Sequence, residues 1–165
     1  MAEITVRKRH TIRKSEAASL FKRLASEIGE SAALFTSGTV ERVDIDSAFT
    51  VYLVDKKPHI FELDEIVFPT LRGAVERPFP QRRIVVDAGA IPFMAKGADV
   101  MRPGIVSLTE DIQEGHPVQI VDERHGKPLA IGIALMDGKA ITDASRGKVV
   151  RTIHHVGDAL WGLSI

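Results

Sequence analysis

A stretch of the chain at residues 86–105 combines the residue types that could contact phosphate groups. It reads VDAGAIPFMAKGADVMRPGI, with glycines at 89, 97 and 104. Glycines at such spacing predict turns where no side chain shields the backbone N–H groups, and Lys96 and Arg102 supply positive charge beside them. Exposed N–H groups next to cations suit phosphate oxygens. A turn whose glycines serve only packing would give the same pattern, so both interpretations stay open on this stretch alone.

No catalytic or metal-binding set accompanies this stretch. The chain has no cysteine and therefore neither disulfides nor thiolate metal sites, and it has no Walker loop, nucleophile elbow or zinc signature. His154 and His155 are expected on a strand, where adjacent side chains point to opposite faces, so they do not easily share one metal ion. We expect one of them in the core and the other exposed, able to stack on a base or contact phosphate. The sequence predicts no enzyme, no cofactor and no metal.

The charge of the chain is balanced, which limits how strongly it could bind nucleic acid. Its 22 basic residues equal its 22 acidic ones, so any RNA surface must come from local clustering. Residues 7–23 hold seven Lys or Arg against one acid, Glu16. This cluster could serve RNA, a protein partner or only solubility, and a solvated helix face would also explain part of it. We name as a secondary basic surface Arg7, Lys8, Arg9, Arg13 and Lys14.

The first half of the chain predicts an α+β domain over residues 1–78. A helix is expected at 17–28, capped by Ser15, ended by Gly29 and buried through Ala18, Phe21, Leu24, Ala25 and Ile28. A second, short helix at 71–75 would be capped by Thr70. Strands are expected at 4–12, 39–45, 49–54 and 59–63. Pro78-Phe79-Pro80 marks the domain boundary.

The second half, residues 79–165, predicts a mainly β domain with one or two short helices. Pro92 is tolerated only near a helix start, so we expect a helix to begin near 89–91 or to kink there, and Asp87 could cap it. At least one of Phe93 and Met94 should be in the core. Short strands joined by Gly- and Pro-rich turns suit a partly closed barrel, and we expect them at 82–86, 99–102, 104–108, 117–122, 129–136, 148–155 and 160–165.

Several motifs of the second half resemble a PUA domain, the RNA-binding module of pseudouridine synthases and archaeosine transglycosylases. They are VDxGAIxF, GADVMRPGI, VQIVD, KPLAIGIA and HHVGDALW, and they cover roughly residues 82–165. The first half resembles the small domain that precedes PUA in the malignant-T-cell-amplified-sequence family and its archaeal relatives. The resemblance implies an α+β N-terminal domain followed by a mainly β PUA pseudobarrel.

The resemblance also implies where structured RNA binds: the glycine loop after the first helix, the strand that follows it, and part of the C-terminal strand. The matching residues are Lys96, Gly97, Ala98, Asp99, Arg102, Lys148, Arg151, His154 and His155, with Arg82 and Arg83 extending the surface. Relatives act in translation with tRNA, the small ribosomal subunit and a partner carrying an initiation-factor-like domain.

We therefore expect a cytoplasmic, translation-associated RNA-binding protein with no membrane partner, because no apolar run approaches the ~18 residues that span a bilayer. Three alternatives stay open on the sequence. The chain could be an accessory RNA-targeting subunit for a tRNA- or rRNA-modifying enzyme. It could be a protein-interaction adaptor, which the zero net charge would suit. It could also be a small-molecule enzyme or regulatory module, for which the sequence shows no pocket of convergent polar groups.

Overall fold

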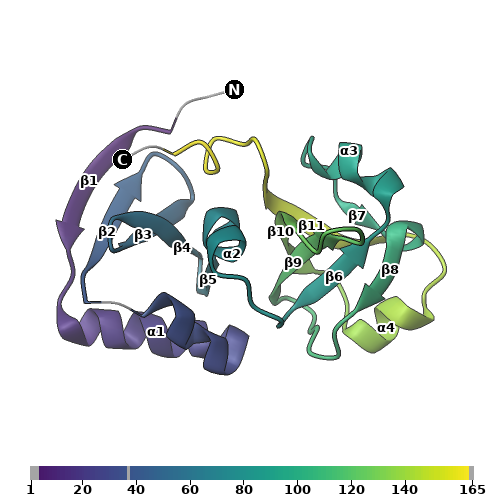
Figure 1. Cartoon of the computed structure of the whole chain (residues 1–165), viewed down its shortest axis with the longest axis horizontal. Coiled ribbons are helices and arrows are strands. Elements are labelled where there is room, and N and C mark those ends of the chain that lie inside the picture. Colours follow the sequence, from purple (N-terminus) through teal and green to yellow (C-terminus); the bar gives the residue numbers. More distant parts are fainter. Residues whose placement is uncertain (1–3, 37, 164–165) are drawn as a thin grey trace. The chain divides into compact units, whose positions relative to one another are not determined.

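The computed structural model describes residues 4–36 and 38–163, which group into two compact units (Figure 1). We call them the N-terminal unit, up to Phe79 together with the chain end from Gly162, and the C-terminal unit, Pro80–Trp161. Each unit is built on its own sheet. The fold class expected from the sequence, an α+β part followed by a mainly β part with short helices, is confirmed.

The N-terminal unit is an antiparallel sheet of five strands in chain order (Figure 1). Asp55 and Lys56 both have positive φ and form the two-residue turn that matches the twist of a hairpin, so the fourth strand begins at Lys57, two residues before its expected start. The strands are β1 (Val6–Thr11), β2 (Val40–Ile45), β3 (Phe49–Val54), β4 (Lys57–Leu63) and β5 (Ile66–Pro69), and the helices are α1 (Lys14–Ile28), the 3-10 helix η1 (Gly29–Phe35) and α2 (Leu71–Glu76).

Helix α1 differs from its prediction at its start and on its buried face. It begins at Lys14 with Arg13 at the N-cap, and no side chain caps it, so the prediction of Ser15 was wrong. Its buried residues are Leu20, Leu24 and Ile28, whereas Ala18 and Ala25 are exposed. A helix face of leucine and isoleucine side chains four residues apart buries more apolar area than the predicted face, which included two alanines. This difference explains why the helix turns the former face toward the core.

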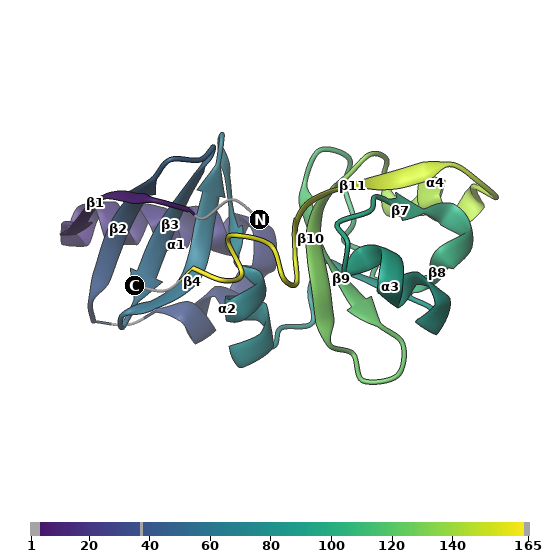
Figure 2. The ribbon, with the colours of Figure 1, turned by 90° about the horizontal axis from the view of Figure 1, so that it is seen from above.

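The C-terminal unit is a six-stranded mixed sheet that curls around an apolar core (Figure 2). The strand order is β7-β11-β10-β9-β6-β8, and only β6 and β9 run parallel. The strands are β6 (Arg83–Val86), β7 (Val100–Met101), β8 (Ile105–Leu108), β9 (Pro117–Asp122), β10 (Pro128–Ala134) and β11 (Lys148–His155). The helices are η2 (Ala88–Ala90), α3 (Ile91–Met94), η3 (Arg102–Gly104) and α4 (Gly138–Asp143).

Local signals placed the first helix of this unit correctly. Asp87 Oδ1 accepts the N–H of Ala90 at 3.1 Å and caps η2, which leads into α3; α3 starts at Ile91, directly before Pro92, and has no side-chain cap of its own. Met94 is in the core and Phe93 is 64% exposed. Helix α4, η1 and β5 were not anticipated.

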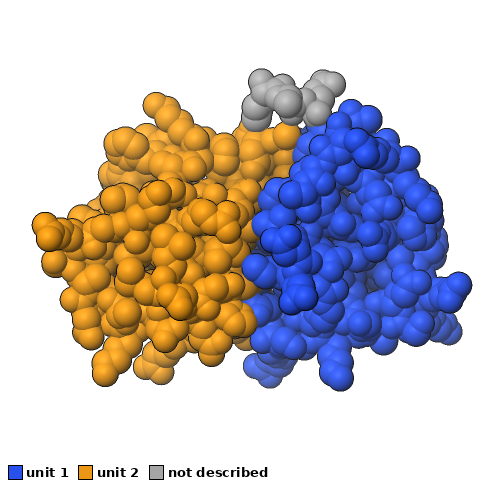
Figure 3. Space-filling model, turned by 180° about the vertical axis from the view of Figure 1, so that it is seen from behind, with its two compact units in different colours: residues 1–79, 162–165 blue, residues 80–161 orange. Residues whose placement is uncertain are grey.

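The last predicted strand, 160–165, is wrong for the residues that the structure describes, and 164–165 lie outside them. Residues 156–162 form turns and a bend instead of a strand. The cause is Asp158, whose carboxylate accepts the N–H groups of His155 and Trp161, both at 2.8 Å, and so curls the chain. Gly162 and Leu163 group with the N-terminal unit, and Figure 3 shows the two units in different colours.

Candidate nucleic-acid interface

The turn after α3 is closed by its own backbone. The N–H groups of Lys96 and Ala98 both donate to the carbonyl of Phe93 at 3.1 Å, and that of Gly97 donates to Met94 at 3.0 Å. The expectation of free N–H groups here is therefore corrected, because a helix end satisfies its last carbonyls in this way. The N–H groups of Lys96, Gly97 and Ala98 are thus not free to bind phosphate, and the charge at this turn comes from side chains.

His155 explains why position 97 is glycine. Gly97 has φ +82°, and a Cβ built on it would lie 2.7 Å from Cδ2 and 2.8 Å from Nε2 of His155. The His155 ring thus rests on the backbone of the turn, and its Nδ1 is 2.9 Å from the carbonyl of Val156. Sequence reasoning assigned both positions to one surface, and the structure brings them into contact through the pairing of β11 with β7.

The two histidines divide as expected. His154 is 1% exposed, and its Nδ1 lies 2.8 Å from Asp158 Oδ2. Burial alone would raise the pKa of the Asp158 carboxyl, but the hydrogen bond and charge of His154, with the N–H groups of His155 and Trp161, hold it below its ordinary value. His154 is therefore a core residue that cannot reach a ligand, while His155 is partly exposed.

Asp99 and Lys148 form an ion pair at the start of β11, with Nζ 2.9 Å from Oδ2. The hydrogen bond from Lys148 lowers the pKa of Asp99, and Asp99 Oδ1 also accepts the N–H of Thr152 at 2.9 Å. Much of the charge of Lys148 is thereby balanced. Lys96 and Arg151 are exposed and have no side-chain hydrogen bond or ion pair with the described residues.

Arg102 is a structural residue more than a surface cation. Its Nε donates to the carbonyl of Ile141 at 2.6 Å, and its Nη atoms donate to those of Ile105 and Thr142 at 3.4 and 3.3 Å. Ile141 and Thr142 lie in the last turn of α4, where a helix leaves carbonyl oxygens free to accept further hydrogen bonds; the carbonyl of Ile141 also accepts the N–H of the C-cap residue Ala144 at 3.2 Å. The guanidinium donors expected to bind phosphate are used to hold α4 against the η3 turn.

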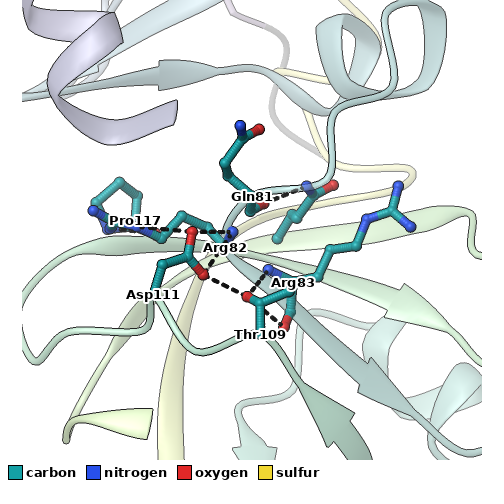
Figure 4. Close-up of polar contacts among 7 residues, drawn as sticks. Gln81, Arg82, Arg83, Thr109, Asp111 and Pro117 are labelled. Atoms are coloured by element: carbon teal, nitrogen blue, oxygen red, sulfur yellow. Dashed lines mark hydrogen bonds and ion pairs between the residues drawn. The ribbon is translucent and has the colours of Figure 1, made fainter. Parts of the chain in front are cut away.

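Arg82 is buried, which corrects the expectation that it extends the surface. It is 5% exposed; its N–H donates to both carboxylate oxygens of Asp111 at 3.0 and 3.2 Å, and its Nη1 donates to the Pro117 carbonyl at 3.3 Å (Figure 4). Arg83 is half-buried, and its N–H donates to Thr109 Oγ1 at 3.0 Å. These contacts fix the start of β6, which β9 and β10 separate from β11 in the sheet.

A pocket of about 400 Å³ opens beside the turn and was missed by sequence reasoning. Its walls come from α3, β7 and the η3 turn, and they are mainly apolar, with Phe93 and Met101 (49% exposed) among them. The signal for it was present, since Phe93 and Met101 fall in the stretch 86–105 that the glycines had marked. An apolar hollow with an exposed aromatic ring suits an unpaired base.

The secondary basic surface lies in the N-terminal unit and is partly neutralised. Arg9 forms a bidentate pair with Glu41 at 2.9 and 3.1 Å, and that hydrogen bond lowers the pKa of Glu41. All six residues of β1 are exposed, as are Arg13 and Lys14. Within residues 4–36 and 38–163, no three acidic or histidine side chains gather as a metal site, and no helix has the length and apolar character to cross a membrane.

Comparison with known proteins matches each half of the chain to a family. Residues 82–156 match the PUA domain, and residues 8–73 match a domain of unknown function, DUF1947. An uncharacterised protein of Methanocaldococcus jannaschii is 40% identical over 157 residues, covering 94% of this chain and 96% of that protein. Translation machinery-associated protein 20 of Saccharomyces cerevisiae is 30% identical over 132 residues, 76% of this chain and 73% of that protein.

A solved structure is similar to this chain over nearly its whole length. The crystal structure of a hypothetical protein from the archaeon Pyrococcus horikoshii OT3 superposes with a TM-score of 0.87 at 37% identity, covering 94% of this chain and 98% of that one. The resemblance drawn from the sequence motifs is thus confirmed. The chain belongs to the family of PUA-domain proteins that includes translation machinery-associated protein 20 and the malignant T-cell-amplified sequence proteins.

Proposed function

We propose that this protein binds structured RNA, tRNA or small-subunit rRNA, through the face formed by the pocket, the 95–99 turn and β11. The observation that carries the proposal is the apolar pocket with exposed Phe93 in the same unit as two exposed cations, Lys96 and Arg151, neither of which forms an ion pair or a side-chain hydrogen bond with the described residues. We call this the pocket face. It contains Lys96, Gly97, Ala98, Asp99, Arg102, Lys148, Arg151 and His155.

Each part of the pocket face has a separate task in this proposal. An unpaired base enters the pocket and stacks on Phe93, a contact worth roughly 1–3 kcal/mol per base in other single-strand binders. Lys96 and Arg151 bind the phosphates on either side. Lys148 and Arg102, whose donors are engaged within the protein, contribute charge and hold the shape. Arg82 and His154 are excluded because both are buried.

The name of the yeast relative supports a place in translation. We propose that residues 79–165 act as the PUA domain and that residues 1–78, with the secondary basic surface, add a second contact in a cytoplasmic complex with the small ribosomal subunit. A partner with an initiation-factor-like domain would fit the same setting. No catalytic step is assigned. An accessory RNA-targeting role for a modification enzyme uses the same surface and differs only in the RNA that binds best.

The test is binding to tRNA and to small ribosomal subunits over a salt series. Lys96→Glu/Arg151→Glu should weaken binding and make its salt dependence shallower by about one unit of slope per cation removed. Phe93→Ala should weaken binding with the salt slope unchanged, because it removes stacking and no charge. Arg124→Glu/Lys127→Glu, two exposed cations of the β9–β10 turn, is the matched control.

Absence of binding at low salt would refute the proposal and favour a protein-interaction adaptor. Equal losses in the Lys96/Arg151 variant and in the Arg124/Lys127 control would show non-specific attraction and would also refute it. Tighter binding to tRNA than to the subunit would support the accessory role.

A further inference from the structure

The two ring nitrogens of His155 differ in their hydrogen bonding. Nδ1 lies 2.9 Å from the carbonyl oxygen of Val156, and because a carbonyl only accepts, Nδ1 carries the hydrogen. In a neutral imidazole the other nitrogen then holds a lone pair and can only accept. Nε2 makes no hydrogen bond with the described residues and is not a fully buried atom, so its lone pair is available to a ligand.

The ring is held rigidly in this orientation. On one side the absent side chain of Gly97 leaves room that a Cβ would fill, within 2.8 Å of Nε2. On the other side the N–H of His155 donates to Asp158 Oδ2 at 2.8 Å, which fixes the backbone that carries the ring. An acceptor fixed in this way can select its partner, because a rigid group loses little entropy when it binds.

His155 is unusual on the pocket face because its neighbours attract negative charge. Lys96 and Arg151 are cations, and the two carboxylates nearby already have partners within the protein: Asp99 contacts Lys148 and the N–H of Thr152, and Asp158 contacts His154 and the N–H of His155. A neutral Nε2 cannot bond a phosphate oxygen, since both atoms are acceptors. It needs a donor from the nucleotide, either a base amino group or the ribose 2′-hydroxyl.

Resting on the proposed function, we infer that His155 Nε2 accepts a hydrogen bond from a ribose 2′-hydroxyl and makes the pocket face select RNA over DNA. The sugar is favoured over the base because each ribose is bonded directly to the phosphates that Lys96 and Arg151 would hold. The 2′-hydroxyl is the group that distinguishes the two nucleic acids. His155 is thus a specificity residue, distinct from the cations that supply affinity.

The experiment measures affinity for four short single strands, oligouridine and oligocytidine as RNA and as their deoxy forms, at about pH 8, where imidazole is ordinarily neutral. The wild type should prefer RNA by roughly three- to tenfold, the effect of one hydrogen bond. His155→Phe keeps a ring of similar shape without an acceptor. It should lower RNA affinity by that factor, leave DNA affinity unchanged and abolish the preference.

Two further variants keep the result interpretable. His155→Gln retains an oxygen acceptor at the end of the side chain and should recover part of the preference. His125→Phe, an exposed histidine of the β9–β10 turn, should change nothing. Thermal unfolding of each variant verifies that the fold is intact.

Three outcomes would overturn the inference. The RNA preference could survive in His155→Phe, or RNA and DNA affinities could fall together. The wild type could also prefer cytidine over uridine, because uridine has no amino group to donate. If His155→Phe abolished that preference and kept the preference for RNA, the hydrogen bond would be made by the base and not by the sugar. A wild type that binds neither these strands nor tRNA and small ribosomal subunits refutes the proposed function itself, whereas one that binds the RNA and DNA strands equally refutes only this inference.

Discussion

Gly97→Ala should destabilise the C-terminal unit through two separable causes. An alanine at φ +82° adopts a conformation that costs an L-residue about 1–2 kcal/mol. Its Cβ would also lie 2.7 Å from His155 Cδ2, so the ring must move and give up its bond to the Val156 carbonyl, at about 1 kcal/mol more. The free energy of unfolding should fall by about 2–3 kcal/mol.

A double-mutant cycle separates the two causes. In a His155→Ala background the ring is absent, so Gly97→Ala should cost only the backbone strain, about 1–2 kcal/mol, and the difference from the wild-type background measures the contact. Urea denaturation followed by the fluorescence of Trp161, the one tryptophan of the chain, reports on the C-terminal unit.

Gly115→Ala supplies the matched control. Gly115 has φ +80°, and a Cβ on it meets nothing within 4 Å. Its substitution should cost the strain alone, by the same amount in the wild-type and the His155→Ala backgrounds. If Gly97→Ala costs no more than Gly115→Ala, or if its cost is the same in both backgrounds, then the ring does not rest on the turn and our account of position 97 is refuted.

Two further predictions concern parts of the chain outside the pocket. Thr70→Ala should lower the free energy of unfolding by about 1 kcal/mol, because Thr70 Oγ1 caps α2 by accepting the Gly73 N–H at 3.0 Å and donates to the Pro58 carbonyl at 2.7 Å. Urea denaturation measures this loss, with Thr39→Ala, at an exposed threonine, as the control. If the two substitutions lower the free energy of unfolding equally, the cap is contradicted. Asp158→Asn should reduce the fall in stability that the protein shows as the pH is lowered into the acid range. The folded-state pKa of Asp158 is depressed, so the stability that its carboxylate contributes is complete above the unfolded-state pKa, near 4, and is lost as the pH falls through the folded-state pKa. Melting temperatures measured against pH test this. If the melting temperature of Asp158→Asn falls as steeply below about pH 4 as that of the wild type, Asp158 does not cause the loss of stability in acid.

Much of the secondary structure was predictable because its signals are local. The strands expected at 49–54, 117–122 and 148–155 are β3, β9 and β11 with the same bounds. The caps by Thr70 and Asp87 were also confirmed, since each bonds a backbone group three residues away. Such features depend on a few neighbouring residues, and the sequence contains all of them.

The site was only partly predictable because residues far away in the sequence decide whether a charged side chain is exposed or is engaged in hydrogen bonds within the protein. Lys96, Arg82 and Arg102 are equivalent in a sequence, but Arg102 meets carbonyls 39 and 40 residues away, and Arg82 meets Asp111 and Pro117. Leu160 was expected in a strand, yet the Asp158 carboxylate curls the chain there into turns.

The sequence by itself therefore determined the family, much of the strand pattern and the turns marked by glycine. Motifs and dihedral preferences are properties of short segments, and they survive without knowledge of the fold. Only the tertiary structure decided which cations remain free, which of two adjacent histidines faces solvent and where a pocket opens. Those outcomes follow from burial and from hydrogen bonds across the sheet, such as Asp99 to Thr152, which join residues that the chain order separates by 53 positions.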